Sequence, residues 1–437
     1  MKLRRLDTAA LGVDGVARAL DRAPESVDPA IHRRVEDILA AVRARGDAAL
    51  VELTERYDRV RVTPAGLRVT AAEFDAAERQ VGEATRAALR YAAARIEAFH
   101  REAMPRSWSM TDATGSHLGQ AVRALERVGI YVPGGRAAYP STVLMTAVPA
   151  RVAGVPEVVL VSPPGPDGTL NAAVLAAARV AGVTEAYRVG GAQAVAALAY
   201  GTESIRRVDK IVGPGNIYVA LAKSRVFGDV GIDMLAGPSE VVVIADAAAE
   251  PAFAAADLLA QAEHDPMARA VLLSPSAALL DLVEAEVSRR LETLPRREIA
   301  ASALEGNGAL VLTASLEEAV DVANRLAPEH LELLVAEPDA LLARVRSAGA
   351  VFLGGATPEV VGDYVAGPNH VLPTGGTARF ASALSTEDFM KRLSVIRYTA
   401  EGLAEAWPHL AELARVEGLA AHGAAAQVRI ETRGETV

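Results

Sequence analysis

One six-residue pattern occurs twice in this chain and limits how it can fold. Ala-Arg-Val-Ala-Gly-Val covers residues 150–155 and again residues 178–183, twenty-eight residues later. In both copies an Ala-rich segment ends at a glycine, the residue that commonly ends a helix, and a strand-like segment follows. A repeated helix-to-strand unit predicts parallel strands joined by right-handed crossover helices.

Short apolar segments continue this alternation and fall into two groups. The first group covers residues 128–132, 158–161, 186–189 and 210–212, and the second covers residues 240–244, 270–273, 309–312, 331–335 and 350–353. Helical segments separate them, so each group predicts a parallel sheet. We therefore expect an α/β protein with two Rossmann-like parallel-sheet lobes and with helical N-terminal and C-terminal extensions.

The same alternation predicts the domain boundaries. We expect an N-terminal arm at residues 1–25, a discontinuous main lobe at residues 26–130 and 240–385, a second lobe at residues 131–239, and a helical tail at residues 386–437. Residues 354–388 are rich in Gly, Pro, Thr and Asn. They are too long for a passive connection, which predicts a functional segment.

Composition excludes several classes of protein. A chain of 437 residues is too long for one simple core. Its net charge of −10 argues against nucleic acid or an anionic membrane as the main partner. The absence of Cys excludes disulfides, thiolate metal sites and cysteine nucleophiles. With no apolar signal region at its start and no long apolar segment, we expect a soluble cytoplasmic protein.

Three glycine clusters follow predicted strands, at residues 133–135, 190–191 and 213–215. Loops of this kind let backbone N–H groups and helix N-termini approach phosphate groups. However, Tyr218 stands where the third glycine of a G-x-G-x-x-G motif would be. At this point nucleotide binding and plain strand-end turns both remain open.

Several N- and O-donor side chains could bind a metal. Gln261 and His264 are three residues apart at a predicted helix end, so one ion could contact both. Asp363 lies in the Gly-rich segment, and Glu417 and His422 lie in the predicted tail. Such a set suits a borderline ion such as Zn²⁺. Each residue taken alone also fits an ordinary role, such as a polar helix end or an Asx turn.

Glu329 and His330 are adjacent at a predicted helix-to-strand junction. Both residue types can move protons near neutral pH, and from an extended segment they could reach a substrate from two directions. A solvated Glu beside a His that packs at the start of a strand is the alternative.

Together these segments resemble the histidinol dehydrogenase family. The resemblance runs in the family's order over roughly residues 25–425. It lies in YVPGG (131–135), VGGAQ (189–193), VGPGN (212–216), AGPSE (236–240), QAEHD (261–265), APEHL (327–331), GDY (362–364), GPNHVLP (367–373) and EGLAAH (417–422).

The resemblance implies an activity, two cofactors and a set of site residues. Members oxidise L-histidinol to L-histidine through the aldehyde with two NAD⁺ and one Zn²⁺ per site, as the final step of histidine biosynthesis, and form homodimers with shared active sites. It implies zinc ligands at Gln261, His264, Asp363 and, from the partner subunit, His422; a catalytic pair at Glu329 and His330; substrate contacts at Ser239, Glu417, His330 and the four zinc ligands; and NAD contacts at Tyr131, Gln193 and Asn216.

The missing cysteine bears on this chemistry. Without a thiolate the aldehyde cannot form a thiohemiacetal, so we expect water to add to it, activated by Glu329, while His330 takes the alcohol proton. We expect zinc to orient the substrate. A zinc hydrolase, a family relative that oxidises another small primary alcohol, and a non-enzymatic binding module are the alternatives. Formation of NADH separates the hydrolase from the expected activity, and a metal-binding assay with an inert nucleotide addresses the binding module.

Overall fold

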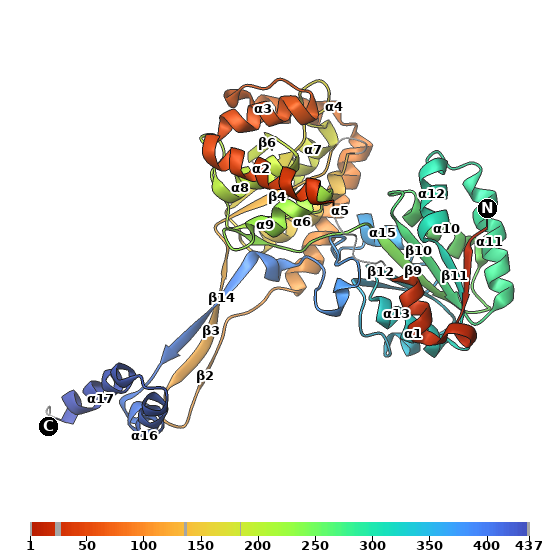
Figure 1. Ribbon diagram of the computed structural model, residues 1–437. Helices are drawn as coiled ribbons and strands as arrows, with labels where there is room; N and C mark the ends of the chain where they lie inside the picture. The colour runs from red at the N-terminus through yellow and green to blue at the C-terminus, as the bar shows by residue number, and fades with distance from the viewer. Residues whose placement is uncertain (1, 22–27, 135–137, 184, 435–437) are drawn as a thin grey trace. The chain divides into compact units, whose positions relative to one another are not determined.

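The computed structural model describes residues 2–21, 28–134, 138–183 and 185–434, which Figure 1 draws as ribbons. They form two compact units. The first unit spans Met1–Ala103 and Leu125–Phe389 and contains two parallel sheets, and the second spans Met104–Ala124 and Met390–Val437 and contains an antiparallel sheet. Among the described residues, no helix is both long and apolar enough to cross a membrane.

One parallel sheet of the first unit has five strands in the order β6-β5-β4-β7-β8. The chain moves outward from β4 to β6 and then returns to the other side of β4, so the strand order reverses between β4 and β7. The strands are β4 (Arg127–Tyr131), β5 (Glu157–Ser162), β6 (Glu185–Arg188), β7 (Lys210–Val212) and β8 (Gly231–Ile232), and the connecting helices are α6 (Pro140–Val152), α7 (Ala172–Ala181), α8 (Gly191–Tyr200) and α9 (Ile217–Val226).

The repeated sequence pattern ends two of these helices in the same way. Gly154 after α6 has a φ of 88°, and Gly182 after α7 has a φ of 84°. In each copy the following valine donates its N–H to an alanine carbonyl five residues earlier, at 3.0 Å for Val155 and 2.8 Å for Val183. This glycine-dependent ending is what the repeat predicts, and it turns the chain into the next strand.

The other parallel sheet has six strands in the order β1-β11-β10-β9-β12-β13. Its central strands are buried on both faces, which explains their continuous Val and Leu segments. The strands are β1 (Arg4–Asp7), β9 (Glu240–Ala245), β10 (Arg269–Ser274), β11 (Ala309–Leu312), β12 (His330–Leu334) and β13 (Ala350–Leu353). The helices are α1 (Thr8–Leu20), α10 (Pro251–Ala262), α11 (Ala277–Leu291), α12 (Arg297–Asn307), α13 (Leu316–Leu326), α14 (Pro338–Leu342) and α15 (Glu359–Tyr364), with short 3₁₀ turns η2 (Thr377–Arg379) and η3 (Thr386–Phe389) further along. The expected α/β class with two parallel-sheet lobes is confirmed.

The N-terminal segment differs from the expected arm. β1 is an edge strand of the six-stranded sheet, in register with β11 from Arg4 opposite Ala309 to Asp7 opposite Leu312. α1 then packs on α13, as the red segment in Figure 1 shows. The strand escapes a pattern-based prediction because it has one apolar residue, Leu6, and is held by backbone pairing. The expected boundary at residue 25 lies outside the described residues.

Residues 26–130 also differ from the expected division. Their helices are α2 (Pro29–Arg45), α3 (Asp47–Asp58), α4 (Ala71–Gln80) and α5 (Glu83–Glu102), with a 3₁₀ turn η1 (Pro64–Gly66). They pack on α6–α9 of the five-stranded lobe, not on the six-stranded sheet. The apolar stripe of α2, which includes Val35, Ile38 and Val42, shares one core with Leu198 of α8. The apolar spacing of these segments is typical of helices, but such a pattern does not identify the sheet that a helix covers.

The second unit combines residues that the expected division assigns to the main lobe and to the helical tail, and it contains strands from both. β3 (His117–Ala124) pairs antiparallel with both β2 (Trp108–Thr111) and β14 (Met390–Arg397). The helices α16 (Ala400–Val416) and α17 (Ala420–Gly434) follow, so the helical prediction for the tail holds only after β14. β14 is exposed along most of its length and lacks a clean alternation of apolar and polar residues, which is why its sequence does not reveal a strand.

His100 is buried in α5 with 1% of its surface exposed, and neither ring nitrogen has a hydrogen-bond partner among the described residues. Burial lowers the pKa of His100 from 6.5 to about 4, so the folded protein holds it neutral at pH 7. The unfolded chain takes up this proton near pH 6.5, whereas the folded chain resists protonation until about pH 4. The free energy of unfolding therefore falls as pH drops through this window.

We predict that His100→Leu flattens this pH dependence. Protonation of the His100 ring lowers the free energy of unfolding by at most about 3 kcal/mol between pH 6.5 and 4, because each pKa unit corresponds to about 1.4 kcal/mol. Urea unfolding of wild type and variant at four pH values between 7.5 and 4.5 measures it. Parallel pH profiles for the two proteins would contradict the assignment.

Candidate active site

His330 is the first residue of β12 and is 4% exposed. Its Nδ1 lies 3.1 Å from the backbone oxygen of Glu240, the first residue of the neighbouring strand β9. A carbonyl oxygen can only accept, so Nδ1 carries the hydrogen and Nε2 keeps its lone pair. Burial lowers the pKa of His330 to about 3, which keeps the ring neutral at physiological pH.

Glu329 is 6% exposed and sits beside the same strand end. Its Oε2 accepts the backbone N–H of Glu240 at 2.9 Å and lies 3.8 Å from Nδ1 of His330. Burial raises the pKa of Glu329 well above its ordinary value, and a side-chain hydrogen bond from Ser239 opposes this shift. Ser239, Glu329 and His330 therefore meet at the amino ends of β9 and β12, where the sequence places the acid–base pair.

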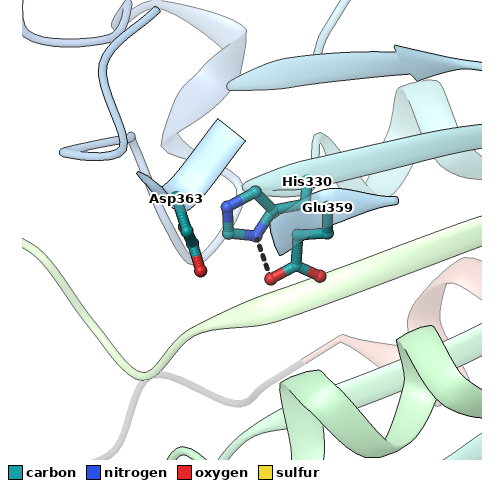
Figure 2. Close-up of side chains that lie close together, drawn as sticks. All are labelled: His330, Glu359 and Asp363. Carbon is teal, nitrogen blue, oxygen red and sulfur yellow. Dashed lines mark ion pairs between the residues drawn. The ribbon is translucent and has the colours of Figure 1, made fainter. Parts of the chain in front are cut away.

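α15 adds two carboxylates to this cluster. Figure 2 shows Glu359 and Asp363 on either side of the His330 ring, and ligand atoms of the three residues all lie within 4.8 Å of one another. Oε1 of Glu359 is 3.5 Å from Nδ1 of His330. Glu359 and Asp363 are four residues apart on one short helix, which places both side chains on the same face.

Gln261 joins the cluster from the end of α10 and is fully buried. In the amide orientation that satisfies both of its ends, its nitrogen donates to Oε1 of Glu359 at 2.7 Å and its oxygen accepts from the N–H of Glu240 at 3.3 Å. The structure thus brings Gln261, Asp363, Glu329 and His330 together, and their roles stay predictions.

Two further histidines lie close by. His264 follows α10 with an exposed side chain, yet desolvation by the protein on its inner side lowers its pKa. A positive charge on His264 would lower the pKa of both His330 and His370. Nδ1 of His370 lies 2.9 Å from the carbonyl oxygen of Asp363, and its Nε2 lies 3.2 Å from Oγ1 of Thr142 in α6. His370 therefore links the two parallel-sheet lobes at the cluster.

The cluster concentrates buried acid. Burial raises the pKa of Asp363 to about 6 and that of Glu359 well above its ordinary value, and the charges of Asp363, Glu332 and Glu329 add to the shift on Glu359. Behind it, burial also raises the pKa of Glu332 and Asp257, which share a hydrogen bond. Such a concentration of carboxyl groups favours binding of a cation.

Sequence reasoning missed Glu359 and His370. Both belong to the Gly- and Pro-rich segment 354–388, which the sequence predicts to be functional, and His370 lies in one of the motifs that carry the family resemblance. A residue-by-residue reading of that segment could therefore have included His370. Glu359 carries no such signal, because a Glu after Pro358 looks like an ordinary first residue of a surface helix.

The five-stranded lobe presents glycine-rich loops at the carboxyl ends of its strands. Tyr131 ends β4, is buried, and accepts the N–H of Gly191 on its hydroxyl at 3.1 Å. Gln193 lies buried in the first turn of α8, and Asn216 caps α9 by accepting the N–H groups of residues 218 and 219 at 3.0 and 3.2 Å. These three predicted contact residues surround the point where the strand order reverses.

The loop between β7 and α9 depends on Gly213. Its φ is 109°, a conformation that L side chains rarely adopt, and a Cβ there would overlap the carbonyl oxygen of Tyr131. The loops after β4 and β7 therefore approach each other closely. Gly135, in the first glycine cluster, lies outside the described residues.

Glu417 and His422 belong to the second unit. Glu417 follows α16 and His422 lies in the first turn of α17, and both are exposed there. Their participation in the site stays a prediction.

Two parallel sheets, one with glycine-rich loops and one with a buried histidine–carboxylate cluster, define an α/β enzyme. A family model described as histidinol dehydrogenase matches residues 21–430. The chain belongs to the histidinol dehydrogenase family and is therefore an oxidoreductase.

Individual relatives agree over nearly the whole chain. The chain is 57% identical to a histidinol dehydrogenase of Geobacillus kaustophilus, over 95% of this chain and 98% of that protein. It is 54% identical to one from Synechococcus, over 94% and 95% of the two chains. The crystal structure of histidinol dehydrogenase from Elizabethkingia anophelis superimposes with a TM-score of 0.94 at 35% identity and covers 99% of both chains.

We predict that Gly213→Ala destabilises the protein more than Gly228→Ala does. Gly228 has a similar φ of 111° but no atom within 4 Å of the position that a Cβ would take, so it controls for backbone strain alone. The overlap with Tyr131 should add about 1–3 kcal/mol, a typical cost of overpacking. Chemical unfolding of both variants measures the difference, and equal losses would show that the β4 and β7 loops do not meet as described.

Proposed function

We propose that this protein oxidises L-histidinol to L-histidine through L-histidinaldehyde, with two successive hydride transfers to NAD⁺, as the final step of histidine biosynthesis. The observation that carries the proposal is the buried pair Glu329 and His330, held by one residue, Glu240, in a chain of this family. A primary alcohol must lose a proton and a hydride in each oxidation, and the pair supplies groups for the proton steps.

Zinc fits the cluster by charge and by donor type. Glu329, Glu359 and Asp363 are three buried or half-buried carboxyl groups with raised pKa values around one histidine, and a divalent cation would relieve their repulsion. With Gln261 and His264 the donors are nitrogen and oxygen, which suits Zn²⁺. We assign Gln261, His264 and Asp363 as ligands from one chain and His422 as the ligand from a second copy. The ion would orient the amino and imidazole nitrogens of histidinol.

NAD fits the five-stranded lobe. The glycine-rich loops lie at the strand-order reversal, where open α/β sheets bind ligands. We assign Tyr131, Gln193 and Asn216 to NAD contacts, because all three border these loops. Bound NAD⁺ would accept the hydride in each oxidation.

His330 acts as the base for the alcohol. Its hydrogen on Nδ1 points to the carbonyl of Glu240, so Nε2 is free to accept the substrate's O–H proton. A neutral ring is required for this role, and burial supplies it. Ser239, beside Glu329, and Glu417, from the second unit, are assigned to substrate binding.

Glu329 acts in the second oxidation. The aldehyde must gain an oxygen, and the chain has no cysteine to add to it. Glu329 therefore activates a water molecule, which converts the aldehyde to a hydrated form that can lose hydride. Burial alone favours protonated Glu329, and a neighbouring cation would favour the carboxylate that this role needs.

We predict two NADH per histidinol, with little free aldehyde. Both oxidations take place at the same buried site, so the aldehyde is consumed before it leaves. Absorbance at 340 nm with limiting histidinol measures the ratio, and an aldehyde-trapping reagent measures escape. One NADH per substrate with accumulated aldehyde would exclude the two-step proposal, and no NADH at all would favour a hydrolase.

The variant Glu329→Gln provides the matched control for this ratio. It keeps the size of the side chain and an acceptor for the Glu240 N–H but cannot take a proton from water. We expect oxidation of added aldehyde to slow by about 10²–10⁴-fold while the first oxidation is affected far less. Equal losses in both steps would separate Glu329 from water activation.

We further propose a homodimer in which each active site uses His422 of the partner subunit. The second unit supports this assignment, because β14 and α16 expose large apolar side chains such as Leu393, Ile396, Leu413 and Val416. A two-fold dimer would cover the same surface in both copies.

Mixing inactive His264→Asn with inactive His422→Asn tests the shared site. A heterodimer then contains one site with both lesions and one with neither. If random exchange makes half of the dimers heterodimers, activity recovers to about one quarter of wild type. Mixing His264→Asn with His264→Ala is the control and should stay inactive. No recovery despite proven subunit exchange would place His422 in its own chain's site.

A further inference from the structure

A buried ion pair joins Lys223 of α9 to Asp233, which directly follows β8. Their side chains are 3% and 0% exposed. Neither residue belongs to the acid–base cluster or to the residues assigned to NAD. Because removing two charges from water is costly, an ion pair so deeply buried contributes little net stability compared with apolar side chains of similar size. The role of this ion pair therefore lies in the backbone groups that it binds.

The pair holds both backbone groups of one residue. The N–H of Gly213 donates to Oδ2 of Asp233 at 2.7 Å, and Nζ of Lys223 donates to the carbonyl oxygen of Gly213 at 2.9 Å. Thus the two peptide groups that flank Gly213 are fixed from opposite sides by opposite charges. Hydrogen bonds to charged groups are stronger than those between neutral groups.

The fold explains why these two side chains meet there. β8 runs parallel to β7, with Ile211 opposite Ile232, so the next residue, Asp233, lies beside the end of β7. Lys223 lies in the last turns of α9, and helical side chains lean towards the helix N-terminus, which in α9 begins at the loop after Gly213. The ion pair therefore forms next to the loop 213–216, in contact with the backbone of Gly213.

We infer that Lys223 and Asp233 are positioning residues that fix the loop 213–216 in its dinucleotide-binding conformation. Gly213 adopts a φ of 109° and packs against the backbone of Tyr131, and the loop ends at Asn216. A rotation of the peptide groups at Gly213 would therefore displace Tyr131 and Asn216, two of the three residues proposed to contact NAD. Because the loop is already held in the free protein, binding NAD need not order it. This inference rests on the proposed NAD-binding function of the five-stranded lobe.

Two double variants separate the hydrogen bonds from the charges. Lys223→Met with Asp233→Leu removes both contacts to Gly213 and leaves an apolar pair of similar size. Lys223→Gln with Asp233→Asn removes the charges but keeps a donor for the Gly213 carbonyl and an acceptor for its N–H. Arg225→Gln with Glu36→Gln is the control, because this exposed pair, 3.0 Å apart, also involves α9 but does not contact the loop.

We expect the apolar pair to raise the KM for NAD⁺ by about tenfold or more, with kcat and the KM for histidinol within about twofold of wild type. The amide pair should recover most of the NAD⁺ affinity, and the control pair should match wild type. A purely structural role would instead lower the amount of active enzyme without changing the KM for NAD⁺. A folded apolar variant with the wild-type KM for NAD⁺ would overturn the inference.

Hydrogen exchange of the wild-type protein provides a second measurement that does not depend on how the variants fold. The amide of Gly213 should be protected before NAD⁺ is added, because Asp233 accepts it in the free protein. Exchange as fast as in an open loop would overturn the inference. Direct titration of wild type with NAD⁺ distinguishes the two proposals, since no binding would remove the proposed function, whereas the protection of Gly213 tests the clamp itself.

Discussion

The backbone of Glu240 is the feature on which the acid–base cluster depends. Its N–H donates to Glu329 and its carbonyl accepts from His330, so two successive peptide groups at the start of one buried strand set both side chains. The Glu240 carboxylate is in turn fixed by a buried ion pair with Arg269 and by the N–H of Gly375 at 3.0 Å. Arg269 also donates to the carbonyl of Leu20 at 2.7 Å. These contacts therefore hold the start of β9, the start of β10 and the end of α1 together next to the acid–base cluster.

The two lobes present opposite ends of their strands, the carboxyl ends in the five-stranded sheet and the amino ends in the six-stranded sheet. The five-stranded sheet offers glycine-rich loops at the carboxyl ends of its strands, as open α/β sheets usually do. The six-stranded sheet instead places Glu240 and His330 at the amino ends of β9 and β12. His370 contacts Thr142 across these lobes. One sheet thus offers loops and the other offers titratable side chains, and the proposed oxidation would use the loops to bind NAD and the side chains to move protons.

The sequence allowed prediction of the parallel sheets, because buried strands and helix-ending glycines leave local patterns such as the repeat at Gly154 and Gly182. It also identified most of the cluster, where Gln261, Glu329, His330 and Asp363 meet. It failed where long-range pairing decides the structure. β1 and β14 have weak patterns and form through partners far along the chain, and α2–α5 have apolar faces that fit either lobe. The sequence does not reveal Glu359 as a site residue, because only its burial in the fold distinguishes it from other glutamates.

The pairing of β1 with β11 has a consequence for synthesis of the chain. Residues 4–7 are synthesised long before their partners, residues 309–312. At typical translation rates of about 5–20 residues per second, the first strand waits roughly 15–60 s for its neighbour. The five-stranded lobe, encoded between them, can complete its own core in that interval. The strand β1 can dock only after β11 has been made, so nascent chains spend most of their synthesis with this segment undocked and open to chaperones and proteases.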